Sequence, residues 1–211
     1  MKKLKIVYED KHILVVEKDS GVLTISTEKE KFNTLFHEVY EYIKKKNQKI
    51  FIVHRLDKDT SGLVLFAKSE KVKNYFQDNW SEIKRKYYAI AYGNNMPKNG
   101  EIKVGLSETK TLKTYVDKSG KLAITKYNKL KEVGKYNLVD IEILTGRKNQ
   151  IRVSLTHIGY PIVGDKKYGD APNPLRRLCL HAYLLEFIHP ITHEHIKLEV
   201  SMPKVFEVLV K

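Results

Sequence analysis

Short runs of apolar residues, some alternating with polar ones, predict strands in the first third of the chain and at positions beyond it. A turn at Ser20-Gly21 separates the second run from the third. The expected strands are LKIVYE (4–9), HILVVEK (12–18), VLTIS (22–26), IFIV (50–53) and GLVLFAK (62–68). The segment HRLDKDTS (54–61) is therefore a loop whose two ends are both held by strands.

Two segments have the helical period of 3.6 residues instead. The first is 34–46, with Asn33 as the expected cap and Lys44 to Lys46 at its end. The second is 70–80, with Ser69 as its cap. Their apolar faces consist of Leu35, Phe36, Val39, Tyr40 and Ile43 in the first, and Val72, Tyr75, Phe76 and Trp80 in the second.

The second half of the chain again reads mainly as strands. We expect strands at 86–93, 121–132, 136–144, 178–187 and 195–201, with a hairpin turn at Gly134-Lys135. Residues 149–158 predict a helix with Ile151, Leu155 and Ile158 inward and Gly159 as its stop, and a short helix follows Pro203. No repeat or linker divides the chain. The pattern predicts one α+β domain over 1–211, with a mainly antiparallel mixed sheet and flanking helices.

Composition narrows the function. Hydrophobic residues make up 42% of the chain, which excludes a disordered protein, and the formal net charge of +14 favours a polyanionic partner such as RNA, DNA or an anionic membrane. Only six of the 39 basic residues are arginine, and four of these lie in the motifs below. The single cysteine, Cys179, excludes an internal disulfide. No apolar run reaches the ~20 residues of a membrane span, and the basic start is too short for a signal peptide, so we expect the cytoplasm.

The loop HRLDKDTSG (54–62) is the sharpest candidate for chemistry. It places Arg55, the carboxylate of Asp57 and the small residues Thr60 to Gly62 between two apolar strands. Rigid strands that hold a charged loop are a common way to present a reactive group. The same residue types also make ordinary exposed turns, so the residues alone leave both interpretations open.

Two further segments offer basic and aromatic groups. In TGRKNQIRVSLTHIGYPIVGDKKYG (145–169), Arg147 and Arg152 flank the start of a helix, where guanidinium groups hold phosphate or keep a carboxylate ionised. GDKKYG lacks the GxxxxGK[ST] pattern of a nucleotide triphosphate loop. In RKYYAIAYG (85–93), the tyrosines serve sheet packing or offer a ring on which a base can stack.

Together these segments resemble the RluA family of RNA pseudouridine synthases over nearly the whole chain. HRLDKDTSGLVLFAKS resembles the family's catalytic motif, RKYYAIAYG its tyrosine strand with the family tyrosine at Tyr87, and TGRKNQIR its TGR-x-x-QIR motif. GYPIVGDKKYG and LCLHAYLLEFIHPIT resemble its downstream segments. The resemblance implies the pseudouridine synthase catalytic fold, with two lobes around a central cleft.

The resemblance also implies site residues. Asp57 is the expected catalytic carboxylate, Arg152 its charge partner, and Tyr87 the ring that stacks on uracil. Arg55 is expected to fill the gap left by a flipped uridine, and the further RNA contacts are expected at His54, Thr60, Arg147 and Gln150. The reaction needs no cofactor or metal. We expect ribosomal or transfer RNA as the partner, and a monomer.

This chain departs from the family at two positions and in one domain. Asn149 and Ser154 stand where the family commonly has histidine. The chain also starts directly with expected catalytic strands, without the ribosomal-protein-like RNA-binding domain that many relatives carry.

Two other classes of function are considered. A non-catalytic RNA-binding module would be signalled by an altered Asp57 or Arg152, and both are intact; a glycosidase using Asp57 and Asp59 would not require a basic chain. His189, His193 and His195 suggest metal ligands, but FIHPITHEH is more typical of a strand end, a turn and the next strand.

Overall fold

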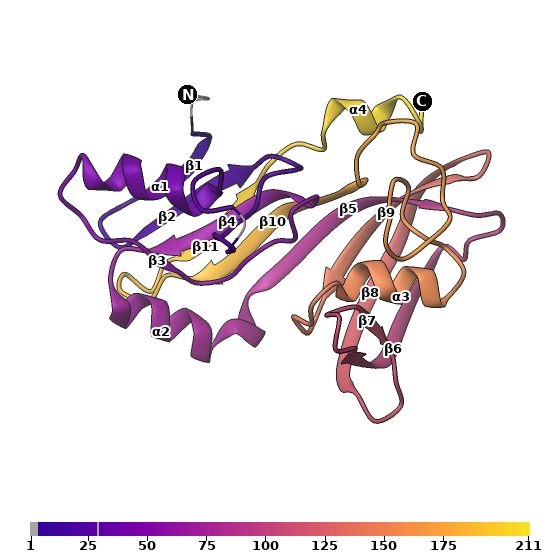
Figure 1. The fold of residues 1–211 in the computed structure, drawn as a ribbon, viewed down its shortest axis with the longest axis horizontal. Coiled ribbons are helices and arrows are strands. Elements are labelled where there is room, and N and C mark those ends of the chain that lie inside the picture. Colours follow the sequence, from indigo (N-terminus) through magenta and orange to yellow (C-terminus); the bar gives the residue numbers. More distant parts are fainter. Residues whose placement is uncertain (1–3, 29) are drawn as a thin grey trace. The chain divides into compact units, whose positions relative to one another are not determined.

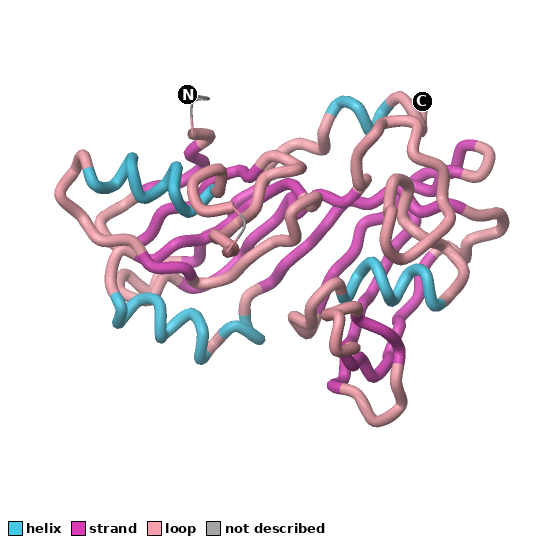
Figure 2. Tube along the Cα trace, in the orientation of Figure 1, coloured by secondary structure: helices cyan, strands magenta, loops and turns pink. Residues whose placement is uncertain are grey.

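The computed structural model describes residues 4–28 and 30–211, so the first three residues of the basic start lie outside it. The chain forms two compact units. The first comprises the residues up to Ile83 together with Leu184–Val200, and the second comprises Lys84–Tyr183 and Ser201–Lys211. The fold is α+β, with strands predominating over helices (Figures 1 and 2), as the sequence pattern predicts.

In the first unit, antiparallel pairs join β1 to β2, β2 to β4, β3 to β4 and β10 to β11. Strands β2 and β4 are almost wholly buried because apolar side chains occupy both of their faces. Their Val15 and Leu65 are partners in the register and fully buried. The strands are β1 (Ile6–Glu9), β2 (Ile13–Lys18), β3 (Phe51–Ile52), β4 (Ser61–Ala67), β11 (His195–Glu199) and β10 (Leu180–Ile188), whose first four residues belong to the second unit.

Two helices, α1 (Leu35–Lys44) and α2 (Glu70–Asp78), belong to this unit, and a 3-10 turn η1 (Trp80–Glu82) follows α2. The Ser69 side chain caps α2 by accepting the N–H of Val72, as predicted. The predicted cap of α1 is wrong by one residue. Thr34, not Asn33, accepts the N–H of His37, because the helix begins at Leu35 and Thr34 is the residue directly before it.

The predicted strand at 22–26 is also wrong. Only Leu23 makes a β-bridge there, with Thr34. The carbonyls of Leu23 and Thr24 accept the N–H groups of Leu35 and Phe36 at the first turn of α1, at 2.8 and 3.0 Å. The carbonyls of this segment therefore bond the free N–H groups at the start of a helix and not a neighbouring strand. Alternation of apolar and polar residues does not distinguish these two kinds of partner.

The second unit contains an antiparallel sheet in the order β5, β9, β8, β6, β7. The hairpin of β8 and β9 turns at Gly134, whose φ of 57° is in the left-handed region, as the sequence predicts. Helix α3 contacts β6, β7 and β8 (Figure 1). The elements are β5 (Lys84–Tyr92), β6 (Asn99–Glu108), β7 (Thr114–Val116), β8 (Lys121–Val133), β9 (Tyr136–Ile143), α3 (Gln150–His157) and α4 (Lys204–Glu207).

The bounds of α3 agree closely with the prediction. Ile151 and Leu155 are buried, and the chain leaves the helix through Gly159, whose φ is 85°. Strands β6 and β7 lie in a stretch for which the pattern predicts no elements. Among the described residues, no helix is long and apolar enough to cross a membrane.

Candidate active site

The loop between β3 and β4 presents the predicted catalytic carboxylate. Asp57 is half-buried, while its neighbour Leu56 is buried and its neighbour Lys58 is exposed. The N–H of Thr60 donates to the carbonyl of Asp57 at 3.2 Å, which closes a turn around the aspartate. Buried Thr60 and exposed Arg55 therefore occupy very different environments, although both are expected RNA contacts.

A second segment, residues 18–24, holds the backbone on both sides of Asp57. The fully buried Lys18 donates from Nζ to the carbonyl of Lys58 at 2.8 Å, and the N–H of Gly21 donates to the same carbonyl at 2.9 Å. The Thr24 hydroxyl donates to the carbonyl of Leu56 at 2.7 Å and accepts its N–H at 3.2 Å. These bonds fix the residues on either side of the aspartate, so the position of Asp57 is set by the fold.

His54 attaches the start of the loop to β4. Its Nε2 accepts the N–H of Leu65 at 3.0 Å, which places the proton of a neutral ring on Nδ1. The imidazole also lies against Trp80, with ring centroids 4.5 Å apart. The observed role of His54 is therefore to anchor the loop, and its contact with RNA stays a prediction.

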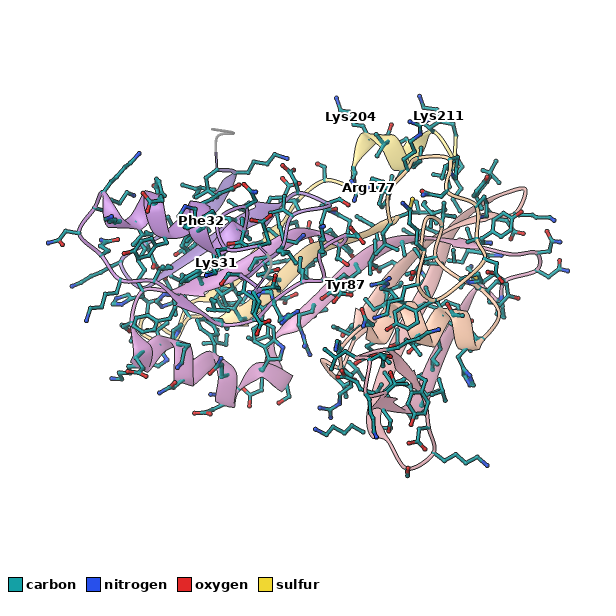
Figure 3. All side chains as sticks on the ribbon, viewed as in Figure 1. Lys31, Phe32, Tyr87, Arg177, Lys204 and Lys211 are labelled. Carbon is teal, nitrogen blue, oxygen red and sulfur yellow. The ribbon has the colours of Figure 1, made fainter. Side chains whose placement is uncertain are left out.

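Tyr87, labelled in Figure 3, lies on β5 and is 9% exposed. It shares a strand face with Arg85, which is buried and donates from Nη2 to the carbonyl of Ile143 at 3.4 Å. Burial lowers the pKa of Arg85, and the neighbouring Tyr87 partly opposes this effect. The phenol of Tyr87, which is predicted to stack on uracil, thus lies on a strand beside the buried guanidinium of Arg85.

The next tyrosine, Tyr88, has a packing role that separates it from Tyr87. Its ring stacks on Tyr183 with centroids 3.9 Å apart and an interplanar angle of 13°. The Tyr183 hydroxyl donates to Asp140 at 2.9 Å, and Lys86 pairs with the other oxygen of that carboxylate at 2.8 Å. Of the two alternatives that the sequence leaves for its tyrosines, packing is observed at Tyr88, and stacking of Tyr87 on a base stays a prediction.

Arg152 projects from α3 and forms a buried ion pair with Asp165. Its Nε donates to Oδ2 at 2.8 Å and its Nη2 donates to Oδ1 at 2.7 Å. Burial acts to raise the pKa of Asp165, but the hydrogen bonds and charge of Arg152, with two backbone N–H groups, outweigh it and lower the pKa. Of the two predicted uses of this guanidinium, the structure shows the second: it keeps a carboxylate ionised. The expected pairing with Asp57 stays a prediction.

Gln150 and Arg147 build the turn before α3. The Gln150 amide oxygen accepts from the Thr145 hydroxyl at 2.7 Å and from the N–H of Arg147 at 2.9 Å. Its amide nitrogen donates to the carbonyl of Ile124 and to Thr125, both at 3.0 Å. These bonds use both N–H groups of the amide, so the observed role of buried Gln150 is to shape the turn. Arg147 is exposed, and the RNA contacts of both residues stay predictions.

Two of the three histidines considered as metal ligands, His189 and His195, make side-chain polar contacts within the protein. His189 accepts backbone N–H groups at Nδ1 and lies with Nε2 3.0 Å from the Asp10 carboxylate, and His195 lies 2.9 Å from Glu186. Within residues 4–28 and 30–211, no group of three or more histidine, cysteine or acidic side chains could hold a metal ion.

Two residues of the site were not identified from the sequence. Asp165 lies in GYPIVGDKKYG, which is matched to a downstream segment of the family without a role for the aspartate, and Lys18 lies at the end of a strand. The signal for Asp165 is indirect: Arg152 stands between Ile151, which is expected to face inward, and Val153, and a guanidinium that becomes buried there requires an acidic partner. Lys18 gives no comparable signal, because lysine at the end of a strand is ordinarily exposed.

Comparison with known proteins identifies similar sequences and folds. A sequence model of the RNA pseudouridylate synthase family matches residues 12–157. The uncharacterized RNA pseudouridine synthase YhcT of Bacillus subtilis is 36% identical over 95% of this chain and 69% of its own length. Ribosomal large subunit pseudouridine synthase D of Pseudomonas aeruginosa is 33% identical over 96% of this chain and 69% of its own. The structure of human RNA pseudouridylate synthase domain containing 1 has the same fold, with a TM-score of 0.79 at 23% identity, over 95% of this chain and 84% of that one.

Proposed function

Because the chain belongs to the RNA pseudouridylate synthase family and is an RNA pseudouridine synthase, we propose that Asp57 is its catalytic carboxylate. The supporting observation is the loop itself. Asp57 is half-buried between β3 and β4, and hydrogen bonds from Lys18, Gly21 and Thr24 fix its neighbours Leu56 and Lys58. A catalytic carboxylate that must be placed against a single atom of a large substrate requires such a fixed backbone.

The reaction breaks the bond from the ribose anomeric carbon to nitrogen 1 of uracil and forms a bond from the same carbon to carbon 5. A proton leaves carbon 5 and nitrogen 1 gains one, so the product is an isomer and no electrons are exchanged. A carboxylate beside the sugar serves this chemistry in one of two ways. It bonds to the anomeric carbon, or it takes a proton from the neighbouring ribose carbon. Both require Asp57 to be ionised.

The remaining roles follow from the matched motifs. Tyr87 stacks on the flipped uracil and Arg55 occupies the gap that the base leaves, which offsets part of the few kcal/mol of lost stacking. Arg152 supplies positive charge that keeps Asp57 ionised. The further contacts with the RNA come from His54, Thr60, Arg147 and Gln150. Gln150 acts by shaping the turn before α3 that faces the RNA.

We favour ribosomal RNA as the substrate, with transfer RNA as the alternative. The choice of ribosomal RNA is supported by the similarity to the Pseudomonas aeruginosa relative, a ribosomal large subunit pseudouridine synthase. We further propose that the enzyme acts as a cytoplasmic monomer. Mapping pseudouridine in ribosomal and transfer RNA from cells that lack the gene tests the substrate: a missing ribosomal position supports ribosomal RNA, and a loss confined to transfer RNA contradicts it.

Asp57→Asn tests the catalytic assignment. Asparagine has nearly the same size but lacks the charge, so the fold remains and turnover falls by at least about 1000-fold, or about 4 kcal/mol of barrier. RNA affinity at fixed salt holds or rises slightly, because one repulsion of the phosphate backbone is removed. The measurements are pseudouridine formed and RNA affinity, made on the same variant and the same RNA.

Asp59→Asn is the matched control, since Asp59 is exposed two residues further along the same loop. It removes the same charge and should retain turnover within about threefold. A glycosidase using both carboxylates would lose activity in both variants and would release free sugar ends. Turnover of Asp57→Asn within about tenfold of the natural protein would show that Asp57 is not the catalytic group.

A further inference from the structure

Arg152 is held by more than its ion pair. Its Nη1 donates to the side-chain oxygen of Asn149 at 3.0 Å, and its guanidinium carbon lies 4.9 Å from the centre of the Tyr168 ring. Together with the two bonds to Asp165, Arg152 donates hydrogen bonds from Nε, Nη1 and Nη2.

The Asn149 amide has a defined orientation. Because a guanidinium only donates, the amide oxygen must face Arg152, and the nitrogen then donates to the Tyr168 hydroxyl at 3.0 Å. That hydroxyl also accepts the N–H of Thr114 at 3.1 Å, which ties the cluster to β7. Asn149 thus links the guanidinium on α3 to a tyrosine that is itself fixed.

The backbone explains why this residue is asparagine. Asn149 precedes α3 with a φ of 52° and a ψ of 19°, in the left-handed region that most side chains avoid. Asparagine tolerates this region better than other residues with a side chain, glycine aside. Histidine is also enriched there, and a neutral imidazole offers one acceptor and one donor, as the amide does. The residue that the family commonly carries here can therefore make the same two bonds.

Asp165 is fixed as firmly as the arginine that it binds. Its side chain is 0% exposed, and its Oδ1 also accepts the N–H groups of Lys167 at 2.9 Å and Tyr168 at 3.1 Å. A carboxylate held by its own backbone turn cannot follow a rotation of the guanidinium. The two planar groups therefore define one orientation of Arg152.

We propose that Asn149 and Asp165 are positioning residues that hold Arg152 in a single orientation for catalysis. The proposal rests on the proposed function, in which Arg152 acts on the catalytic carboxylate. Asn149 fixes the orientation of Nη1 by accepting its N–H. Asp165 fixes the orientation of Nε and Nη2 in the same way. Neither residue needs to contact the RNA.

The test compares Asn149→Gly with Asn149→His and with Asn95→Gly. Glycine accepts the left-handed backbone and removes only the amide, and histidine restores an acceptor and a donor. Asn95 is the control because it is exposed with a φ of 56°, far along the chain from α3. We expect kcat to fall about tenfold in Asn149→Gly, to stay within about threefold in Asn149→His, and to be unchanged in Asn95→Gly. RNA affinity and Tm should change little in all three.

The orientation is also measured without activity, from the nitrogen NMR signals of the Arg152 guanidinium in the free protein. We expect separate, slowly exchanging Nη signals in the natural protein and in Asn149→His, and averaged signals in Asn149→Gly. Averaged signals in the natural protein, or full kcat in Asn149→Gly, overturn the proposal. If the Nη signals are separate but the protein forms no pseudouridine in any RNA, the single orientation of Arg152 is upheld and the proposed function is refuted instead.

Discussion

Arg152 shows how much a single charged residue demands of its surroundings. Arg152 is only 7% exposed on α3, so its guanidinium must be paired, and Asp165 supplies the pair with two hydrogen bonds. The pairing sets the properties of both residues. The pKa of Asp165 is lowered although burial raises it, because the arginine and two N–H groups favour the charged form.

Arg152→Met tests that dependence through stability. Methionine strands a buried carboxylate, which typically costs about 3–5 kcal/mol unless the group takes a proton. Without the arginine, burial raises the folded pKa of Asp165 above its unfolded value. A proton-binding group of this kind adds stability at low pH and loses it as pH rises. The free energy of unfolding of Arg152→Met, measured in urea, should therefore fall further below that of the natural protein at pH 8 than at pH 5.

The double variant Arg152→Met/Asp165→Asn is the control for this prediction. Asparagine keeps an oxygen that accepts the N–H groups of Lys167 and Tyr168 but carries no charge to strand. The double variant should regain part of the stability at pH 8 and none of the turnover. An equal loss of stability for Arg152→Met at both pH values would show that the buried charge is not the cause.

At the scale of elements, one acidic side chain joins β1 to α1 and to the residue after β4. Glu9 accepts from the Tyr42 hydroxyl at 2.7 Å, from Lys46 at 2.8 Å and from Lys68 at 2.7 Å. Burial acts to raise the pKa of Glu9, but the two lysines and the tyrosine outweigh it and lower the pKa from 4.5 to about 2. The cluster attaches the first strand to elements about 30 to 60 residues away in sequence.

Glu9→Gln tests this attachment. A carboxylate whose folded pKa is lowered adds stability above its unfolded pKa and loses it as pH falls toward the folded pKa. Glutamine should therefore destabilise the protein by about 1–3 kcal/mol at pH 7, with the difference shrinking between pH 4.5 and about 2. Urea unfolding at pH 7, 4 and 2.5 measures this. The same substitution at exposed Glu70 is the control, and a difference that does not change with pH would refute the role of Glu9.

Lys18 joins the end of β2 to the loop of Asp57. Besides the carbonyl of Lys58, its ammonium binds the carbonyls of Asp19 at 3.0 Å and Val22 at 2.7 Å. Lys18→Met keeps the length of the side chain but removes one charged donor from each of these carbonyls, so we expect a loss of at least about 2 kcal/mol. Turnover should also fall at temperatures where the variant is folded. Lys11→Met, at an exposed position, is the control; equal stability of the two variants would contradict the role of Lys18.

Most elements that the sequence predicts well are those whose burial follows one period. Helices α1 and α2 and the hairpin of β8 and β9 agree within a few residues, because each has one buried face. The bounds of α3 also agree, although Gln150 to Leu155 are all buried. The segment at 22–26 was wrongly predicted as a strand because its carbonyls bond the start of a helix. That choice depends on residues 35 and 36, which the local pattern does not include.

The residues of the candidate site also fall into a predictable and an unpredictable group. The loop of Asp57 is predictable because two apolar strands bound it, and Tyr87 is predictable as a candidate because it lies in a motif. Asp165 and Lys18 are not, because their importance comes from partners that the fold brings to them. The packing of Tyr88 and the internal bonds of Gln150 are equally invisible in sequence, since both depend on which residues face them across strands.

For the whole molecule, the two kinds of basic residue have different uses. Arg85 and Arg152 are buried, Arg147 donates to the carbonyl of Leu122 at 3.0 Å, and Arg177 lies 5.1 Å from the Phe206 ring. The net charge of +14 comes mainly from lysines, among them the exposed Lys204 and Lys211 labelled in Figure 3. Lysine is a hydrated, mobile point charge, suited to phosphates whose positions vary along an RNA.

Binding of RNA should therefore depend steeply on salt. Each neutralised phosphate on a single strand contributes about −0.7 to the slope of log affinity against log salt, so five contacts give a slope of about −3.5. Titrations of labelled RNA with Asp57→Asn between 50 and about 300 mM salt measure the slope without turnover during the experiment. The unfolding temperature, followed over the same range, shows that salt acts on binding and not on the fold. If binding were carried by stacking on Tyr87 and a few neutral contacts, the slope would be shallower than about −1, and the lysine surface would not drive recognition.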